Sequence, residues 1–151
     1  MGASSNPPWS SRITLKILVV DDDETIRATT NYILTDAGHS VSVAADGIEA
    51  LGLVRACIFD VAICDVRLPK LDGMTLFRLL RRESPSTAVI VLTSYPEVQD
   101  ALECLEAGGA DFITKPLDRA GLLRRIDRIG VRLSRWPARP TLTNAIGLRR
   151  T

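Results

Sequence analysis

The chain has 151 residues, of which 46% are hydrophobic and 25% are charged, and its formal net charge is +1. This composition is typical of a folded domain with a substantial core. No apolar run approaches the roughly 20 residues of a membrane-spanning helix, and residues 1–11 lack the apolar centre of a signal peptide. We therefore expect a cytoplasmic protein that has no membrane partner.

Strands and helices alternate along the chain. In order we predict a strand at 15–20, a helix at 24–37, a strand at 40–44, a helix beginning after Asp46, a strand at 59–64, a helix at 73–83, a strand at 88–92, a helix at 97–107, a strand at 111–114 and a helix at 119–133. Gly38 is a residue favoured just past a helix end, and Asp46 with Glu49 forms a capping box. Five strands alternating with five helices indicate an α/β fold with a parallel sheet and right-handed crossovers.

Charge is divided unevenly between two parts of the chain. Residues 12–118 carry 10 Lys and Arg against 17 Asp and Glu, whereas residues 119–151 carry nine Arg against one Asp. We expect a disordered leader at 1–13, one folded domain at 14–134, and a basic tail or the start of a linker at 135–151.

Carboxylates follow two of the most apolar strands. Asp21 and Asp22 come directly after residues 15–20, and Asp65 comes directly after residues 59–64. In an open parallel sheet ligands bind at the carboxyl ends of the strands, so these three side chains should converge. Three close carboxylates repel one another unless a hard cation, most simply Mg²⁺, lies among them. A carboxylate beside Mg²⁺ is also a credible phosphoryl acceptor.

Four motifs at the ends of strands resemble the receiver domain of bacterial two-component response regulators. They lie at residues 17–23, 65–73, 91–94 and 111–116. The resemblance covers residues 15–133 and implies a doubly wound, flavodoxin-like (βα)5 domain, similar to CheY, with strand order 2-1-3-4-5. It also implies that the protein is a signalling switch and not an enzyme in the usual sense.

The resemblance assigns a role to each polar residue at these strand ends. Asp65 is implied to be the phosphoacceptor, and Mg²⁺ is implied to bind Asp21, Asp22, Asp65 and the backbone carbonyl of Arg67. The residues implied to bind the phosphoryl group or to respond to it are Thr93, Ser94, Lys115 and Phe112. The bond before Pro116 is expected to be cis. Arg67 and Tyr95 are bulky, and at these positions the family controls the access of hydrolytic water.

The implied partners follow from the same resemblance. They are a sensor histidine kinase or a phosphotransfer protein, and a downstream protein or an output domain that this sequence lacks. Phosphorylation is expected to change the surface formed by the helix at 97–107, the strand at 111–114 and the helix at 119–133. A homodimer through this surface would pair the acidic residues of 97–106 with Arg124, Arg128, Arg132 and Arg135. DNA binding by this chain is the weaker option because its body is acidic.

Other interpretations compete with this one. Residues 21–25 also match the Asp-x-Asp-x-Thr motif of haloacid-dehalogenase-type phosphatases, but that assignment leaves Asp65 unexplained and offers no later acidic pair. A dinucleotide-binding domain is excluded because carboxylates occupy the turn that glycines would need. Asp23 and Glu24 are better explained as acids at a helix N-terminus. The cysteines lack metal-ligand spacing, and His39 is expected to be structural.

Overall fold

The computed structural model describes residues 13–94, 108, 111–116 and 118–134. The elements are β1 (Lys16–Val20), α1 (Glu24–Asp36), β2 (Ser40–Ala44), α2 (Gly47–Ala56), β3 (Val61–Cys64), α3 (Gly73–Glu83), β4 (Ala88–Thr93), β5 (Asp111–Thr114) and α5 (Arg119–Ser134). The elements predicted within these ranges are present with small shifts at their ends. The helix predicted at 97–107 lies outside the described residues.

The five strands form one parallel sheet in the order β2-β1-β3-β4-β5. This is the predicted order, and it confirms the doubly wound, flavodoxin-like fold. The strand order reverses between β1 and β3. From β1 the chain passes to β2 on one side of it, and β3, β4 and β5 are then added in turn on its other side. The crevice at such a reversal is where open α/β sheets bind ligands.

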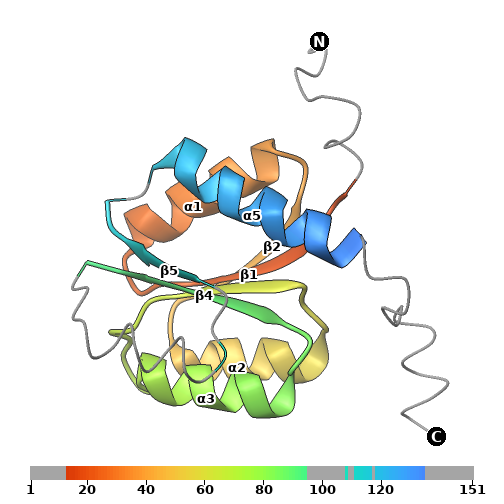
Figure 1. The fold of residues 1–151 in the computed structure, drawn as a ribbon. Coiled ribbons are helices and arrows are strands. Elements are labelled where there is room, and N and C mark those ends of the chain that lie inside the picture. The colour runs from red at the N-terminus through yellow and green to blue at the C-terminus, as the bar shows by residue number, and fades with distance from the viewer. Residues whose placement is uncertain (1–12, 95–107, 109–110, 117, 135–151) are drawn as a thin grey trace, which may run out of the picture.

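Helices cover both faces of the sheet (Figure 1). α1 and α5 lie on one face and α2 and α3 lie on the other. Two hydrophobic clusters correspond to these faces. One contains Leu34, Ile126 and Ile129 from α1 and α5, and the other contains Ala50, Phe77 and Leu80 from α2 and α3. Because both faces are covered, the central strands β3 and β4 are buried except at Ala88, the first residue of β4, which explains their near-continuous apolar sequence.

Several local predictions are confirmed. Asp23 caps α1 by accepting a hydrogen bond from the backbone N–H of Ile26 at 3.1 Å. Asp46 and Glu49 form the capping box of α2, in which Asp46 accepts from Glu49 N at 2.8 Å and Glu49 accepts from Ala45 N at 2.7 Å.

His39 and α5 have the structural roles expected from the sequence. The Nδ1 atom of His39 accepts a hydrogen bond from Leu15 N at 3.1 Å, which satisfies a backbone donor just before β1. On α5, Leu122, Ile126 and Ile129 are buried against the sheet, and Leu133 packs at its edge. In the ranges that the structure describes, no helix is both long and apolar enough to span a bilayer.

Candidate functional site

The carboxyl ends of β1 and β3 bring two predicted carboxylates together. Val20 is the register partner of Cys64, so Asp21 and Asp65 occupy equivalent positions immediately past the two strands. Backbone hydrogen bonds continue across this junction, because Asp65 N donates to Val20 O at 3.0 Å and Asp21 N donates to Ala44 O at 3.1 Å. Both carboxylates are therefore held by the sheet itself and not by a loose loop.

Three carboxylates form one cluster at this edge. Carboxylate oxygens of Asp21, Asp22 and Asp65 all lie within 4.8 Å of one another. Asp21 is 2% exposed and Asp65 is 7% exposed, whereas Asp22 faces solvent. The three carboxylates among the predicted metal ligands therefore lie close together, and their oxygens are the kind of donor that Mg²⁺ and Ca²⁺ prefer.

One oxygen of the cluster indicates that a cation fits there. Oδ2 of Asp21 is buried and, among the described residues, has no partner in hydrogen-bonding geometry. Its contact with Nζ of Lys115, at 2.8 Å, is an ion pair that leaves the oxygen without a well-directed donor. Buried carboxylate oxygens ordinarily have such partners. A hard divalent cation would satisfy this oxygen, so the residues present fit an Mg²⁺ site.

Lys115 joins the cluster from β5. Its Nζ lies 2.8 Å from Asp21 and donates a hydrogen bond to Oδ2 of Asp65 at 2.9 Å, and its side chain is only 8% exposed. Burial lowers the pKa of the ammonium, but its contacts with Asp21 and Asp65 outweigh this effect, so the pKa of Lys115 is raised. Lys115 therefore stays charged and offsets part of the negative charge of the cluster.

The backbone around Lys115 fixes this placement. Lys115 N donates to Thr93 O at 2.7 Å, so the end of β5 stays paired with the end of β4. The peptide bond between Lys115 and Pro116 is cis, the isomer that the sequence predicted.

Asp21 is more constrained than its position in the sequence suggests. Its Oδ1 accepts a hydrogen bond from Asp23 N at 2.9 Å, and its backbone carbonyl accepts one from the guanidinium of Arg27 at 2.8 Å. Burial raises the pKa of the Asp21 carboxyl above its usual value, although Lys115 and Asp23 act in the opposite direction. The charged form of Asp21 is thus costly in this structure, and a bound cation would relieve that cost.

The loop from Asp65 to Gly73 folds back on the acceptor position. Arg67 N donates to Oδ1 of Asp65 at 3.1 Å, and Gly73 N donates to Val66 O at 3.0 Å. A Cβ atom at Gly73 would lie 2.3 Å from the carbonyl oxygens of Asp65 and Val66, so only glycine fits there. Asp72 then caps α3 by accepting from Met74 N and Thr75 N. Gly73 therefore has a structural role, and this close approach is its physical reason.

The other predicted site residues lie at the ends of β4 and β5. Thr93 is buried and is the last residue of β4, where its register partner is Thr114. Ser94 follows it and is exposed. Phe112 is half-buried on β5 and packs against the cluster on the α2–α3 side of the sheet. Tyr95 lies outside the described residues.

Sequence reasoning missed three residues that support the site. Arg27 holds the Asp21 carbonyl, Lys70 adopts a positive φ of 70° in the loop after Asp65, and Gly47 lies against that loop. Arg27 and Lys70 carried no distinctive signal. Gly47 carried a weak one, because glycine is a poor helix former and yet begins α2, which is consistent with a packing reason.

Comparison with known proteins agrees with the geometry. A family model described as the response regulator receiver domain matches residues 17–127. The transcriptional regulatory protein ZraR of Klebsiella oxytoca is 37% identical over 102 residues, which cover 68% of this chain and 23% of ZraR. The response regulator MprA of Mycobacterium sp. (strain KMS) is 37% identical over 131 residues, which cover 85% of this chain and 57% of MprA. This chain thus spans only part of the length of these relatives.

A solved structure shows the same similarity in three dimensions. The chemotaxis response regulator CheY4 of Vibrio cholerae superimposes with a TM-score of 0.71 and 32% sequence identity. The match covers 78% of this chain and 99% of CheY4.

Proposed function

This chain belongs to the response regulator receiver domain family of two-component signalling, and on that premise we propose that it is a phosphorylation-dependent switch whose phosphoacceptor is Asp65. The observation that carries the proposal is the placement of Asp65. Its carboxylate is nearly buried at the end of β3, accepts a hydrogen bond from Lys115, and lies in one cluster with Asp21 and Asp22. Asp21 shares the burial, the cluster and a contact with Lys115, but only Asp65 is followed by the loop of residues 65–73, whose Arg67 N–H donates to its carboxylate.

The proposed reaction is a phosphoryl transfer to the side chain of Asp65. A carboxylate oxygen attacks the phosphorus of a phosphohistidine or a small acyl phosphate, a P–O bond forms, and the bond from phosphorus to the donor atom breaks. The product is an acyl phosphate on Asp65. The protein contributes mainly position and charge, as phosphoryl transfer requires. It is therefore a phosphoacceptor and not an enzyme in the usual sense.

Asp21, Asp22, Asp65 and the backbone carbonyl of Arg67 would hold Mg²⁺ in this site. When bound, the ion supplies positive charge that offsets the charge of the acceptor and of the incoming phosphoryl group. Oδ2 of Asp21 is buried and, beyond its ion pair with Lys115, has no hydrogen-bond donor among the described residues, which supports its inclusion as a ligand or as a partner of a bound water. Oxygen ligands and a small number of protein contacts are sufficient for Mg²⁺, which keeps several waters.

Lys115 and the end of β4 would recognise the product. In this structure Lys115 pairs with the carboxylate of Asp65, and a phosphoryl oxygen on that carboxylate would become its new partner. The hydroxyl of Thr93 and the backbone N–H of Ser94 would donate to the other phosphoryl oxygens. Inward rotation of Phe112 would follow the movement of Thr93. These steps bias an equilibrium that already exists between two conformations.

The proposed partners lie upstream and downstream of this switch. A sensor histidine kinase or a phosphotransfer protein would supply the phosphoryl group, and the surface formed by residues 97–107, β5 and α5 would pass the signal on. Because the chain matches only 23% of ZraR and 57% of MprA, the output that it controls is a proposal as well. It is a partner protein or an attached output domain, and a cytoplasmic location remains the expectation of the sequence.

Mass spectrometry of the intact protein tests the proposal. We expect the wild-type protein to gain one phosphoryl group from acetyl phosphate when Mg²⁺ is present and none when EDTA replaces it. Asp65→Asn should abolish the gain. Asp21→Asn should retain a reactive Asp65 but require more Mg²⁺. Labelling that persists in Asp65→Asn and disappears in Asp21→Asn would instead support the phosphatase-type assignment and overturn this one.

A further inference from the structure

We infer that Gly47, the first residue of α2, is a positioning residue for the phosphoacceptor loop, the segment formed by residues 65–73. The inference rests on the proposed function, because it concerns the geometry that Mg²⁺ and the phosphoryl group require. Gly47 is distant in sequence from Asp65 and touches no reacting atom. Its role is to let α2 approach the loop closely enough to fix the loop in place.

The backbone conformation of Gly47 does not explain why glycine occurs there. Within the described ranges the glycines with positive φ are Gly38 and Gly108, and Gly47 is not one of them. The backbone of Gly47 would therefore accept alanine without strain. The reason for glycine is steric. A Cβ atom at position 47 would lie 2.6 Å from both Cβ and the carbonyl oxygen of Leu71.

The phosphoacceptor loop presents Leu71 to α2 through a tight turn. Lys70 has φ of 70°, and Leu71 N donates to Pro69 O at 2.7 Å, so the chain reverses around Lys70. The side chain of Leu71 then packs against the hydrophobic cluster that contains Ala50. Nζ of Lys70 lies 3.3 Å from Oδ2 of Asp46, the residue that caps α2. The start of α2 thus contacts the loop at two adjacent residues, Lys70 at the centre of this turn and Leu71 at its end.

The loop is also fixed near its origin. Gly73 N donates to Val66 O at 3.0 Å, and a Cβ at Gly73 would meet the backbone of Asp65 and Val66 at 2.3 Å. Val66 is held by this hydrogen bond, so only residues 67–70 lie between it and Leu71. These four residues would have to absorb any displacement of Leu71. Arg67 is among them, and its N–H holds Oδ1 of Asp65. A movement of Leu71 is therefore transmitted to the Arg67 carbonyl and to the Asp65 carboxylate.

The magnitude follows from the contact distances. Real Cβ atoms essentially never approach other heavy atoms closer than 3.0 Å, so alanine at 47 must displace the Leu71 backbone by several tenths of an ångström. Mg²⁺ demands near-ideal octahedral geometry, and residues that only orient metal ligands typically change affinity by about 10-fold to 100-fold. We therefore expect Gly47→Ala to weaken Mg²⁺ binding by about 10-fold.

A second glycine in the same helix provides a matched control. Gly52 is exposed on α2, and a Cβ built on it meets nothing within 4 Å. The experiment compares Gly47→Ala with Gly52→Ala in the full chain, by calorimetric titration with Mg²⁺ and by the rate of phosphorylation from acetyl phosphate at saturating Mg²⁺. Gly52→Ala should raise the unfolding midpoint and leave Mg²⁺ affinity and rate at wild-type values. Gly47→Ala should lose affinity and rate while remaining folded.

Each outcome either supports or overturns the positioning role of Gly47. If Gly47→Ala changes the unfolding midpoint but binds Mg²⁺ and accepts phosphoryl like Gly52→Ala, the role of Gly47 is merely structural and the inference is wrong. If Gly47→Ala does not fold, Leu71→Ala tests the same contact from the loop side, with Leu53→Ala as its control because Leu53 packs against the same cluster from α2. Loss of Mg²⁺ affinity in Leu71→Ala alone supports the inference, and equal affinity in both variants overturns it. A wild-type protein that neither binds Mg²⁺ nor accepts phosphoryl would refute the proposed function instead.

Discussion

Lys115 and Asp65 are 50 residues apart in the sequence, yet Nζ of Lys115 lies 2.9 Å from Oδ2 of Asp65. The contact links the ends of β5 and β3, which are separated in the sheet by β4. In this structure the ammonium occupies the position from which it would meet a phosphoryl oxygen. The same ammonium also pairs with Asp21, so one cation compensates two nearly buried carboxylates.

Removal of Lys115 should destabilise the fold. Lys115→Met leaves Asp21 and Asp65 without their buried cation, and we expect a loss of about 3 kcal/mol of unfolding free energy in EDTA. The pKa of Lys115 is raised by its two carboxylate partners, so on the alkaline side its stabilisation is fully present at pH values below its ordinary pKa of 10.5 and is lost as the pH rises through the higher folded value. Urea unfolding at pH 7 measures the loss.

Lys70→Met is the control for this prediction. Lys70 also pairs with an aspartate, but its side chain is 67% exposed. An exposed pair contributes little, so Lys70→Met should unfold like the wild-type protein. Equal losses in the two variants would contradict the prediction.

His39 should make stability depend on pH. Burial lowers the pKa of His39 below 6.5, although the charges of Asp127 and Asp60 oppose the shift. The folded state therefore favours the neutral ring, so the stabilisation is full above pH 6.5 and is lost as the pH falls through the folded pKa. His39→Asn keeps an acceptor for Leu15 N–H but cannot titrate, so the difference in unfolding free energy between the two proteins should change between pH 7.5 and 5. His39 is the only histidine of the chain, so its ring proton shifts in an NMR titration identify the folded pKa directly. A constant difference would contradict the prediction.

At position 70, glycine should give a more stable protein than alanine. Lys70 has φ of 70°, a conformation that costs an ordinary residue roughly 1 kcal/mol or more and costs glycine almost nothing. We expect Lys70→Gly to be more stable than Lys70→Ala by about 1 kcal/mol, because both variants lack the pair with Asp46 and differ only at the backbone. Thermal and urea unfolding of the two variants measure the difference. A more stable Lys70→Ala would show that the turn is not constrained in this way.

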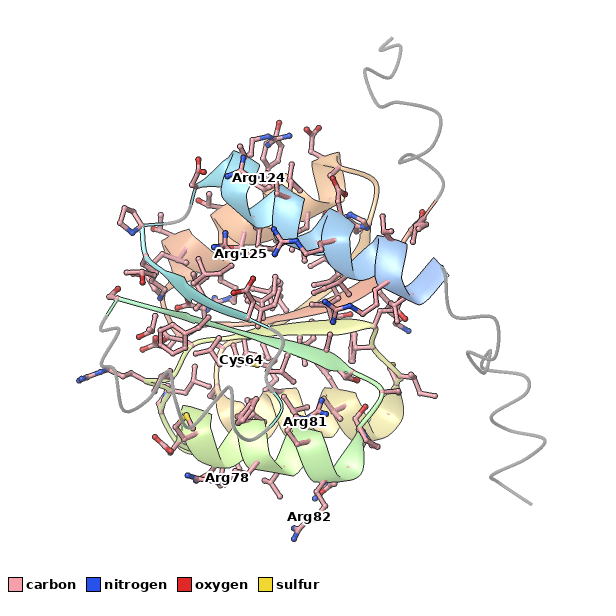
Figure 2. All side chains as sticks on the ribbon, in the orientation of Figure 1. Cys64, Arg78, Arg81, Arg82, Arg124 and Arg125 are labelled. Atoms are coloured by element: carbon pink, nitrogen blue, oxygen red, sulfur yellow. The ribbon has the colours of Figure 1, made fainter. Side chains whose placement is uncertain are left out.

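Arg67 and Tyr95 should prolong the phosphorylated state. Both are bulky and stand two positions beyond Asp65 and Thr93 in the sequence, where the family resemblance implies control of water access, so we predict that they hinder the attacking water. We expect the double variant Arg67→Asn/Tyr95→Glu to lose its phosphoryl group several times faster than the wild-type protein, as followed by intact mass after the donor is removed. Arg82→Asn is the control, because Arg82 projects from α3 away from the sheet (Figure 2). Unchanged or slower loss in the double variant would count against the idea.

The sequence predicted those features that depend on local pattern. Apolar runs such as the one before Asp65 placed the strands, and the Asp46–Glu49 spacing placed the start of α2. The ends of two strands then placed Asp21, Asp22 and Asp65 at one edge, because parallel strands bring their carboxyl ends together, whereas the place of Lys115 came from the family resemblance. The strand order itself came from family resemblance and not from the patterns alone.

The remaining features depend on distances between elements, which local pattern does not contain. To predict the ion pair between Lys115 and Asp21, one would need the lengths of β4 and β5 together with the twist of the sheet. The hydrogen bond from Arg27 to the Asp21 carbonyl depends on where α1 begins relative to β1. The contact of Gly47 with Leu71 depends on a left-handed turn at a lysine, which no sequence rule for glycine or asparagine would place there.

Cys64 directly precedes the proposed acceptor and lies between the two helix layers (Figure 2). Burial raises the pKa of its thiol to about 12, so essentially no thiolate exists at neutral pH, and the thiolate is the reactive form of cysteine. Of the two adjacent side chains, only the carboxylate of Asp65 is therefore available to an electrophile. A switch built in this way should remain indifferent to peroxide and to alkylating agents at this position, so that its state reports the supply of phosphoryl donor and not the oxidative condition of its surroundings.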